Sequence, residues 1–301
     1  MTVTPCPRYE HLYFSACVAA GRLAAANPGL EILLIEQGPN NLGEPTVVTP
    51  GLFMTHLAPD SKTALFWQGN KGSGLNDRAP VVASGGVLGG GSSINFMMYA
   101  RASASDFDDW NTPGWGSKDL IPLLKKLETY HVAPGRDTHG YNGPVNVSYS
   151  NYCAPIAQEF LDAHVRKGVP LVEDMMDTKT GYGCQRLPKY IDPITNYRQD
   201  AAHRYIHPQA NNKSLHILTK TKAVRVVFEG TKAIGVEVVA NKAQVPDADE
   251  TDPRSCFSAV ASAAHNDSPN SGSRLWLTCQ ALVVNTKITP PRVPSSISPT
   301  I

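Results

Sequence analysis

The spacing of apolar positions predicts two adjoining elements near the start of the chain. Residues Phe14–Ala26 are rich in alanine, with Arg22 between apolar neighbours, which predicts a helix that ends at Asn27-Pro28-Gly29. Residues Leu30–Glu36 are mostly apolar and close on an acid, which predicts a buried strand. A helix, a short turn and a buried strand ending in an acid form the second half of a βαβ dinucleotide-binding unit. In such units the acid accepts hydrogen bonds from the hydroxyls of the adenosine ribose.

Glu36 is therefore the first candidate binding residue, although the first half of the unit has no visible counterpart. Glu36 stands 20 residues after Ala16, where the last small residue of a Gly-x-Gly-x-x-Gly fingerprint would lie. The preceding segment, Pro7–Ser15, holds neither an apolar strand nor a glycine. Either these residues form no nucleotide site, and Glu36 is a solvent-facing acid at a strand end, or the chain has lost its original N-terminus.

Periodic patterns predict further elements along the chain. Helices are expected at Ser117–Tyr130, Ile156–Lys167 and Ala201–Tyr205. Strands are expected at Val145–Tyr149, Leu215–Thr219, Ala223–Phe228, Ala233–Val239 and Arg274–Val284. A turn at Glu229-Gly230 joins two of these strands as a hairpin. Residues 37–82 are expected to be rich in loops, and the aromatic residues Trp110, Trp115 and Tyr130 are expected in the core.

A glycine-rich loop lies between these elements. The segment Ser84–Ser92 holds five glycines and two serines in nine residues, and an apolar run follows it. Backbone amides in such a loop approach a ligand closely because no β-carbon intervenes, so they can bind a phosphate. The loop is not a P-loop, because no Gly-Lys-Ser/Thr follows, and it is not the turn of a βαβ unit, because no full-length strand is expected directly before it. A flexible surface linker is the alternative.

Composition narrows the classes of function. The chain has 301 residues, of which 42 % are hydrophobic, enough for one large domain or two ordinary ones. A net charge of +1 argues against nucleic acid or a membrane surface as a partner bound through charge. No apolar run reaches the length of a membrane helix, and no secretory signal is visible. Six scattered cysteines without a Cys-x-x-Cys pair indicate free thiols in a reducing compartment and no zinc site.

With the acid-ended strand, the glycine-rich loop and the late hairpin in this order, the sequence resembles the glucose-methanol-choline (GMC) flavin oxidoreductases. Gly85–Asp108 follows the first signature of that family, with Leu88–Asn95 as its core. Within the family, the fungal alcohol (methanol) oxidases are similar over Asp60–Ala64 and Ala100–Trp110. The likeness covers Ala16–Lys242.

The resemblance implies an α/β fold, with an FAD-binding Rossmann-like domain that is incomplete here and part of an inserted substrate domain. FAD would lie along the glycine-rich loop. The residues carried over as cofactor contacts are Glu36 at the adenosine ribose, Gly90 and Gly91 at the pyrophosphate, Asn95 and Met98 beside the flavin ring, and Ala223 against the adenine. The implied segments are residues 1–150 (FAD-binding, with the first signature), 151–194 (partial substrate domain), 195–242 (returning FAD-domain segment) and 243–301 (a divergent tail expected to be disordered).

The implied reaction is FAD-dependent oxidation of a primary, short-chain alcohol to an aldehyde, with oxygen as acceptor and hydrogen peroxide as product. The partners would be a small alcohol and oxygen, with no nucleic acid or membrane, and a homo-oligomer stays open for the full-length family. The family resemblance further implies an intracellular, peroxisomal location. The terminal Pro299-Thr300-Ile301 is not a peroxisomal tripeptide.

Three departures from the family pattern affect the expected activity. Gly86 replaces a basic residue often found before the loop, the Gly-x-Gly-x-x-Gly turn is absent, and the family's catalytic histidine pair lies beyond the end of this chain. The catalytic residues are therefore unknown. Of the nine histidines, His203 and His207 share a helical face; they are expected to be structural, and they have no third metal ligand nearby.

We therefore expect a truncated chain that is weakly active or inactive. The alternative is a non-catalytic remnant or binding module of the same ancestry. A nicotinamide-dependent Rossmann reductase would need an intact fingerprint and a Tyr-x-x-x-Lys or similar site, and neither is visible.

Overall fold

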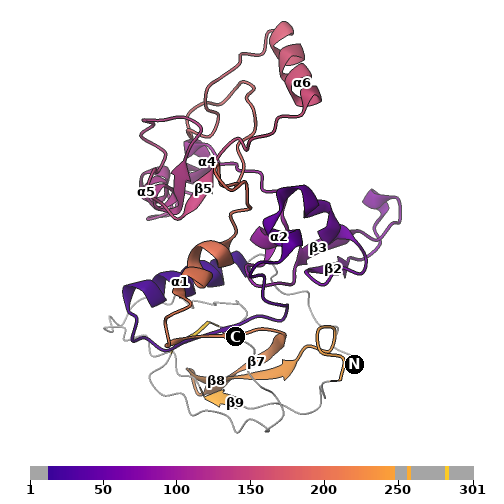
Figure 1. Ribbon diagram of the computed structural model, residues 1–301, viewed down its shortest axis with the longest axis vertical. Helices are drawn as coiled ribbons and strands as arrows, with labels where there is room; N and C mark the ends of the chain where they lie inside the picture. Colours follow the sequence, from indigo (N-terminus) through magenta and orange to yellow (C-terminus); the bar gives the residue numbers. More distant parts are fainter. Residues whose placement is uncertain (1–12, 248–255, 259–281, 285–301) are drawn as a thin grey trace. The chain divides into compact units, whose positions relative to one another are not determined.

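The computed structural model describes residues 13–247, 256–258 and 282–284 (Figure 1). The chain divides into two compact units. Unit 1 is formed by the described residues up to Asn40, by Lys62–Gly91 and by the described residues from Tyr205 onward, and unit 2 by Asn41–Ser61 and Ser92–Arg204. The glycine-rich loop ends where the chain passes from unit 1 to unit 2.

Unit 1 is built on small sheets. In the first sheet, β1 (Ile32–Ile35) lies between a parallel strand, β6 (Leu215–Leu218), and an antiparallel strand, β10 (Leu282–Val284). The second sheet is the hairpin of β2 (Ala64–Gln68) and β3 (Val81–Gly85). The third is antiparallel and consists of β7 (Thr221–Glu229), β8 (Lys232–Ala240) and β9 (Cys256–Ser258), which Figure 1 shows as neighbouring strands. The helical elements are α1 (Tyr13–Ala26) and the 3₁₀ turns η2 (Ser73–Leu75) and η4 (His207–Gln209).

The first predicted helix and strand are both confirmed. One face of α1 consists of small buried side chains, because Ala16, Ala20 and Ala24 recur every four residues and are at most 6 % exposed. All four residues of β1 are buried, as expected for a strand with neighbours along both edges. Each fully buried Ile or Leu side chain stabilises the fold by about 1.5–3 kcal/mol. Helices and strands together confirm the α/β class.

The predicted hairpin around Glu229-Gly230 is also confirmed. β7 and β8 each contain nine residues and pair from Thr221 with Ala240 to the turn. The apolar cluster that joins this hairpin to β1 is formed by Leu33, Ile35, Val236 and Val238. Ala223 of β7 packs against the same cluster, which ties it to the strand that leads into Glu36.

The expectation that no full-length strand stands directly before the glycine-rich loop was wrong, because β3 has five residues. β2 and β3 pair from Ala64 with Gly85 to Gln68 with Val81, so β3 ends inside the loop sequence. Val81 and Val82 are 62 % and 55 % exposed, so β3 lacks the one-sided burial that produces an alternating pattern. The strand belongs to an antiparallel hairpin, and the loop after it is therefore still not the turn of a βαβ unit.

Unit 2 combines helices with one small sheet. Its elements are α2 (Pro45–Val48), the 3₁₀ helix η1 (Pro50–Leu57), α4 (Ala104–Asp108), α5 (Ser117–Leu127), β4 (Glu128–Tyr130), β5 (Val145–Val147) and α6 (Pro155–Arg166). β4 and β5 pair in parallel. Two short helices, α3 (Gly91–Ile94) and the π-helical turn η3 (Ala202–Ile206), lie where the chain passes between the units. Across the described residues, none of the helices has the length and apolarity that crossing a bilayer requires.

The helices predicted for unit 2 have different outcomes. α6 confirms the helix expected at Ile156–Lys167. The helix expected at Ser117–Tyr130 is right only as far as Leu127, because the next three residues form β4. Glu128 and Tyr130 are both buried, at 0 % and 2 % exposure, and positions two apart share a face in a strand but not in a helix.

The expectation that Trp110 and Trp115 lie in the core was wrong. They are 55 % and 52 % exposed, and their ring centroids are 5.8 Å apart. Phe107 packs edge-on against Trp110 at 6.1 Å, so the tryptophans cover each other and one neighbour at the surface. Paired aromatic rings gain contact energy in this way without a core around them. Tyr130, the third residue of that set, is buried as expected.

Candidate functional site

Glu36 directly follows β1 and is held by hydrogen bonds of its main chain. Its N–H donates to the carbonyl of Leu218 at 2.9 Å, and its own carbonyl accepts from the N–H of Thr221 at 3.0 Å. The residue is only 5 % exposed, so Glu36 is not a solvent-facing acid. Its carboxylate accepts from the N–H of Gly38 at 2.7 Å, and within the described part of the chain it has no ion-pair partner.

The surroundings of Glu36 leave its carboxylate short of hydrogen-bond donors. Burial raises the pKa of Glu36 from 4.5 to about 7, although the backbone N–H groups of Gly38 and Gln37 act in the opposite direction. An ionised carboxylate has about four lone-pair sites for hydrogen bonds, so sites remain for a ligand. Hydroxyl donors would stabilise the ionised form, whereas a phosphate of the same charge would not. The site therefore suits a pair of ribose hydroxyls.

The glycine-rich loop packs against the turn that follows β1. A β-carbon at Gly38 would collide with the carbonyl of Gly86, so these two segments approach each other closely. The N–H of Leu88 also donates to the carbonyl of Pro39 at 3.0 Å. The loop is therefore a fixed part of unit 1 next to Glu36, which argues against a flexible linker.

Gly90 and Gly91 have different surroundings. Gly90 is buried with φ at +56°, and its N–H donates to the carbonyl of Val87 at 2.8 Å inside the loop. A β-carbon at Gly91 would meet no atom within 4 Å, so the backbone there borders open space. A ligand beside the loop would therefore meet Gly91, whereas Gly90 shapes the turn.

Asn95 and Met98, the residues expected beside the flavin ring, belong to unit 2. Both are exposed, Met98 by 57 %. The side-chain oxygen of Asn95 accepts from Arg198 Nη1 at 2.9 Å and from the N–H of Met97 at 2.9 Å. Asn95 is therefore an exposed residue whose side chain has a fixed orientation.

Three buried polar residues that sequence reasoning did not single out hold this part of unit 2. Arg198 and Asp200 are 2 % and 0 % exposed, and Asn41 is 0 % exposed. The side-chain amide of Asn41 donates to Ser93 Oγ at 3.0 Å and to Asp200 Oδ1 at 3.0 Å. In the sequence these residues lie in segments with no periodic pattern, so no local signal marks them as buried.

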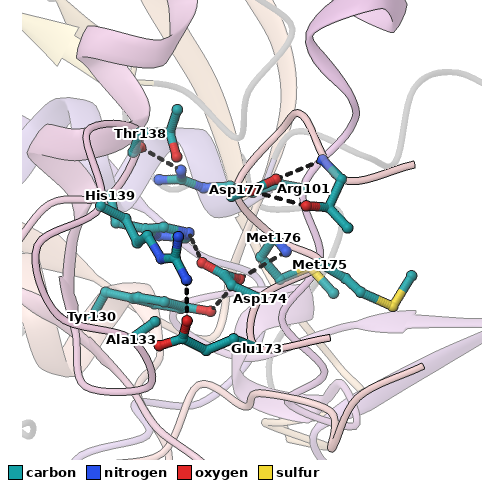
Figure 2. Close-up of polar contacts among 12 residues, drawn as sticks. Arg101, Tyr130, Ala133, Thr138, His139, Glu173, Asp174, Met175, Met176 and Asp177 are labelled. Atoms are coloured by element: carbon teal, nitrogen blue, oxygen red, sulfur yellow. Dashed lines mark hydrogen bonds and ion pairs between the residues drawn. The ribbon is translucent and has the colours of Figure 1, made fainter. Parts of the chain in front are cut away.

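A second group of buried charges, the His139 cluster, lies elsewhere in unit 2 and consists of Arg101, Glu128, His139 and Asp174. His139 Nδ1 is 2.8 Å from Glu128 Oε1, and His139 Nε2 is 3.1 Å from Asp174 Oδ2. Figure 2 shows His139 beside Tyr130, whose ring stacks on it at 3.6 Å and whose hydroxyl donates to Asp174 at 2.9 Å. Arg101 adds a second cation 2.6 Å from Glu128.

The His139 cluster is balanced in charge. Burial alone lowers the pKa of His139, but hydrogen bonds to Asp174 and Glu128 outweigh burial, and the pKa is raised. Burial likewise tends to raise the pKa of Asp174, yet hydrogen bonds from His139, the Met176 N–H and Tyr130 leave it lowered. Both ring nitrogens face buried carboxylates and the side chain is 0 % exposed, so a substrate cannot reach the ring to give up a proton.

Other described histidines also have structural partners. His203 Nδ1 is 2.6 Å from Asp200 Oδ2, and His216 Nε2 is 2.8 Å from Glu31 Oε2. His11 and His265 lie outside the described residues. Among the residues that the structure describes, no three His, Cys, Asp or Glu side chains are grouped as metal ligands.

Known proteins resemble this chain over most of its length. An alcohol oxidase of Candida boidinii is 45 % identical over 230 residues, which are 76 % of this chain and 35 % of that protein. The mitochondrial choline dehydrogenase of Homo sapiens is 31 % identical over 236 residues, covering 75 % of this chain and 39 % of that protein. Among solved structures, an FAD-dependent oxidoreductase from Chaetomium thermophilum matches with a TM-score of 0.68 and 31 % identity, over 76 % of this chain and 40 % of that one.

The chain thus spans about a third of the length of the alcohol oxidase it matches, 35 %. The GMC oxidoreductase family matches residues 15–265, which include the glycine-rich loop, Glu36 and Ala223. Because this match covers well over half of the 301 residues, the chain belongs to the GMC oxidoreductase family.

Proposed function

We propose that this protein takes part in FAD-dependent oxidation of a primary, short-chain alcohol to an aldehyde, with oxygen as acceptor and hydrogen peroxide as product. The observation that carries the choice of substrate is the 45 % identity to an alcohol oxidase over 76 % of the chain. The choline dehydrogenase relative is less similar, at 31 %, so a small uncharged alcohol is the better-supported substrate class.

The residues in unit 1 fit the adenosine half of FAD. The carboxylate of Glu36 has lone pairs left for two hydroxyl donors, and Gly91 borders open space where a pyrophosphate could approach the backbone. Ala223 packs on the apolar cluster next to β1, which suits a small side chain against an adenine ring. These three residues, with Gly90 shaping the loop, would hold that half of the cofactor.

In unit 2, Asn95 and Met98 would lie beside the flavin ring. Asn95 has a side chain held by two hydrogen bonds, and Met98 offers an exposed apolar surface. When bound, FAD would supply the acceptor for the hydride that leaves the alcohol carbon. The protein's own contribution there is an apolar shelf and a polar group of set orientation.

The chain by itself is expected to turn over alcohol weakly or not at all. Oxidation needs a base that accepts the hydroxyl proton of the alcohol. His139 is fully enclosed, and each of its ring nitrogens lies beside a buried carboxylate. The family resemblance assigns the role of that base to no residue of this chain. A non-catalytic binding module of the same ancestry is the second candidate, favoured by the missing Gly-x-Gly-x-x-Gly turn.

Flavin binding and peroxide release separate the two candidates. The purified full chain would be titrated with FAD, followed by flavin fluorescence and absorbance, and then given methanol or ethanol with a peroxide assay. We expect saturable FAD binding and little peroxide. Fast peroxide release would contradict the expected weak turnover, and a colourless protein that binds no added FAD would favour the second candidate. The peroxisomal location, the homo-oligomer and the four-segment domain division stay predictions.

A further inference from the structure

Among the described residues, Arg198 is the largest fully buried side chain, at 2 % exposure, and it donates three hydrogen bonds to Ser92 and Asn95. Its Nη1 donates to the carbonyls of Ser92 at 3.2 Å and Asn95 at 2.7 Å, and to Asn95 Oδ1 at 2.9 Å. Its Nε donates to the carbonyl of Val47 at 2.8 Å. The guanidinium thus links α2, through Val47, to α3, through Ser92, and to Asn95, the residue that directly follows α3.

A purely space-filling role does not account for a guanidinium at this position. Within the described part of the chain, no carboxylate lies within ion-pair distance of Arg198, and its Nη2 is buried without an acceptor. Burial lowers the pKa of Arg198 from 12.5 to about 10, so the group is still charged at neutral pH. Burying a charge in this way costs free energy that an apolar side chain of the same size would not.

The contact with Asn95 determines which end of that amide faces outward. Arginine can only donate hydrogen bonds, so the atom of Asn95 that it meets must be the oxygen. The N–H of Met97 donates to the same oxygen at 2.9 Å. With its oxygen occupied twice, Asn95 presents its NH2 group as a donor on an exposed residue.

The backbone beyond Asn95 needs such support. Met97 is buried at 4 % exposure and has φ at +58°, a left-handed conformation that is strained for a residue with a β-carbon. Strained residues persist where surrounding contacts hold them. Arg198 binds both the main-chain and side-chain oxygens of Asn95, at the start of this strained turn.

We propose that Arg198 is the positioning residue that holds Asn95 with its NH2 group outward, as a fixed hydrogen-bond donor to an acceptor atom of the flavin ring. This inference rests on the proposed FAD site. Flavin rings carry carbonyl oxygens and ring nitrogens that accept hydrogen bonds, so a donor of set orientation matches them. Arg198 touches no cofactor itself and acts through Asn95.

The positioning can be tested without FAD. In the full chain labelled with ¹⁵N-asparagine, the side-chain amide signals of Asn95 are identified by their loss in Asn95→Asp. In Arg198→Met we expect the chemical shifts of these Asn95 signals to move toward those of an asparagine side chain that has no fixed hydrogen bond. If Arg198→Met does not fold, the same measurement is made on Arg198→Lys. Lysine keeps the buried charge but cannot reach all the oxygens of Val47, Ser92 and Asn95 that Arg198 binds. Unchanged Asn95 signals in a folded variant would overturn the proposal.

A matched control comes from Arg186, whose Nη2 donates to the carbonyls of Tyr149, Ser150 and Tyr152 at 2.8, 3.0 and 2.9 Å. Arg186→Met removes a similar set of arginine–carbonyl bonds in unit 2 and should leave the Asn95 signals unchanged. Movement of those signals in Arg186→Met as large as in Arg198→Met would contradict a specific role for Arg198.

FAD titration is the second test, and it measures whether Arg198 affects FAD affinity through Asn95. Arg198→Met should weaken FAD binding about tenfold, the loss expected for a hydrogen bond in a polar site. In an Asn95→Ala background the same change should have little further effect, because the two residues act as one unit. Fully additive losses would overturn action through Asn95. A wild-type chain that binds no FAD would overturn the proposed function, and the NMR arm would still decide the orientation of Asn95.

Discussion

Two buried glutamates, one in each unit, have opposite surroundings. Glu128 lies 2.6 Å from Arg101 and 2.8 Å from His139, and also accepts from the N–H of Gly140 at 3.0 Å and from the Tyr99 hydroxyl. Glu36 accepts from backbone amides alone, and the described residues place no cation beside it. Glu128 is 0 % and Glu36 5 % exposed, so burial does not distinguish them.

The difference shows which buried carboxylate has all its hydrogen bonds made within the protein and which can still accept hydrogen bonds from a ligand. A carboxylate surrounded by cations and donors has no hydrogen bond left to make, so Glu128 is structural. A buried carboxylate with too few donors has a perturbed pKa and gains from any ligand that donates hydrogen bonds. Glu36 meets this description, which is why it leads the candidate cofactor site.

Glu128→Gln should have the largest effect on stability. The change leaves the positive charges of Arg101 and His139 without their shared anion, and loss of one partner of a buried ion pair costs about 3–5 kcal/mol. The free energy of unfolding, from urea titration followed by circular dichroism at pH 6, should fall by that amount. Glu173→Gln, in the exposed ion pair with Arg136, is the control. Equal stabilities of the two variants would show that the His139 cluster does not stabilise unit 2.

Glu36→Gln should act on the ligand and leave the fold intact. Because no described cation depends on Glu36, its neutralisation should leave the free energy of unfolding at pH 8 unchanged or higher. The dissociation constant for FAD should rise about tenfold, as expected for the loss of hydrogen bonds to a charged group. Glu31→Gln, at a partly exposed acid before β1, is the matched control. Undiminished FAD affinity in Glu36→Gln would remove Glu36 from the site.

The pH dependence of stability should also separate the two acids. For Glu36, the raised pKa means that its contribution to stability is fully present below pH 4.5 and is lost as the pH rises toward about 7. For His139, whose pKa is raised, the contribution is fully present below pH 6.5 and is lost as the pH rises through the folded pKa. For Asp174, whose pKa is lowered, it is present above pH 3.8 and is lost as the pH falls through the folded pKa.

The contribution of Glu36 to wild-type stability should therefore decline from about pH 4.5 upward and that of His139 from about pH 6.5, whereas His56, whose pKa is lowered by burial, adds stability as the pH rises toward 6.5. Urea unfolding over a series of pH values would measure it. Glu36→Gln should remove the decline between about pH 4.5 and 7 and leave the later one. If the early decline persists in Glu36→Gln, another group is responsible for it.

The smallest effect is expected at an exposed pair. Arg225 Nε lies 2.6 Å from Glu237, with the arginine side chain 65 % exposed on the β7–β8 hairpin. Exposed pairs contribute about 0–1 kcal/mol, so Glu237→Gln should shift the thermal midpoint only slightly. If Glu237→Gln lowered the free energy of unfolding as much as Glu128→Gln, burial of an ion pair would not determine how much it stabilises this protein.

The sequence by itself determined the elements that have a strong local pattern. Alanines four residues apart identified α1, a continuous apolar run identified β1, and alternation around a turn identified the β7–β8 hairpin. The same order of motifs led to the GMC family, which the family match over residues 15–265 confirms. Local spacing was sufficient there because each element buries one regular set of side chains.

Only the tertiary structure decided which residues are buried by distant neighbours. β3 exists because it pairs with β2, the tryptophans are exposed although they are apolar, and Arg198 meets Asn95 across 103 positions of sequence. The sequence placed Glu36 at a strand end. Its raised pKa depends on the segments that pack around it, which bury the carboxylate and, among the described residues, bring no cation to it. Burial and charge compensation are set by contacts between distant segments, and local spacing carries no information about those contacts.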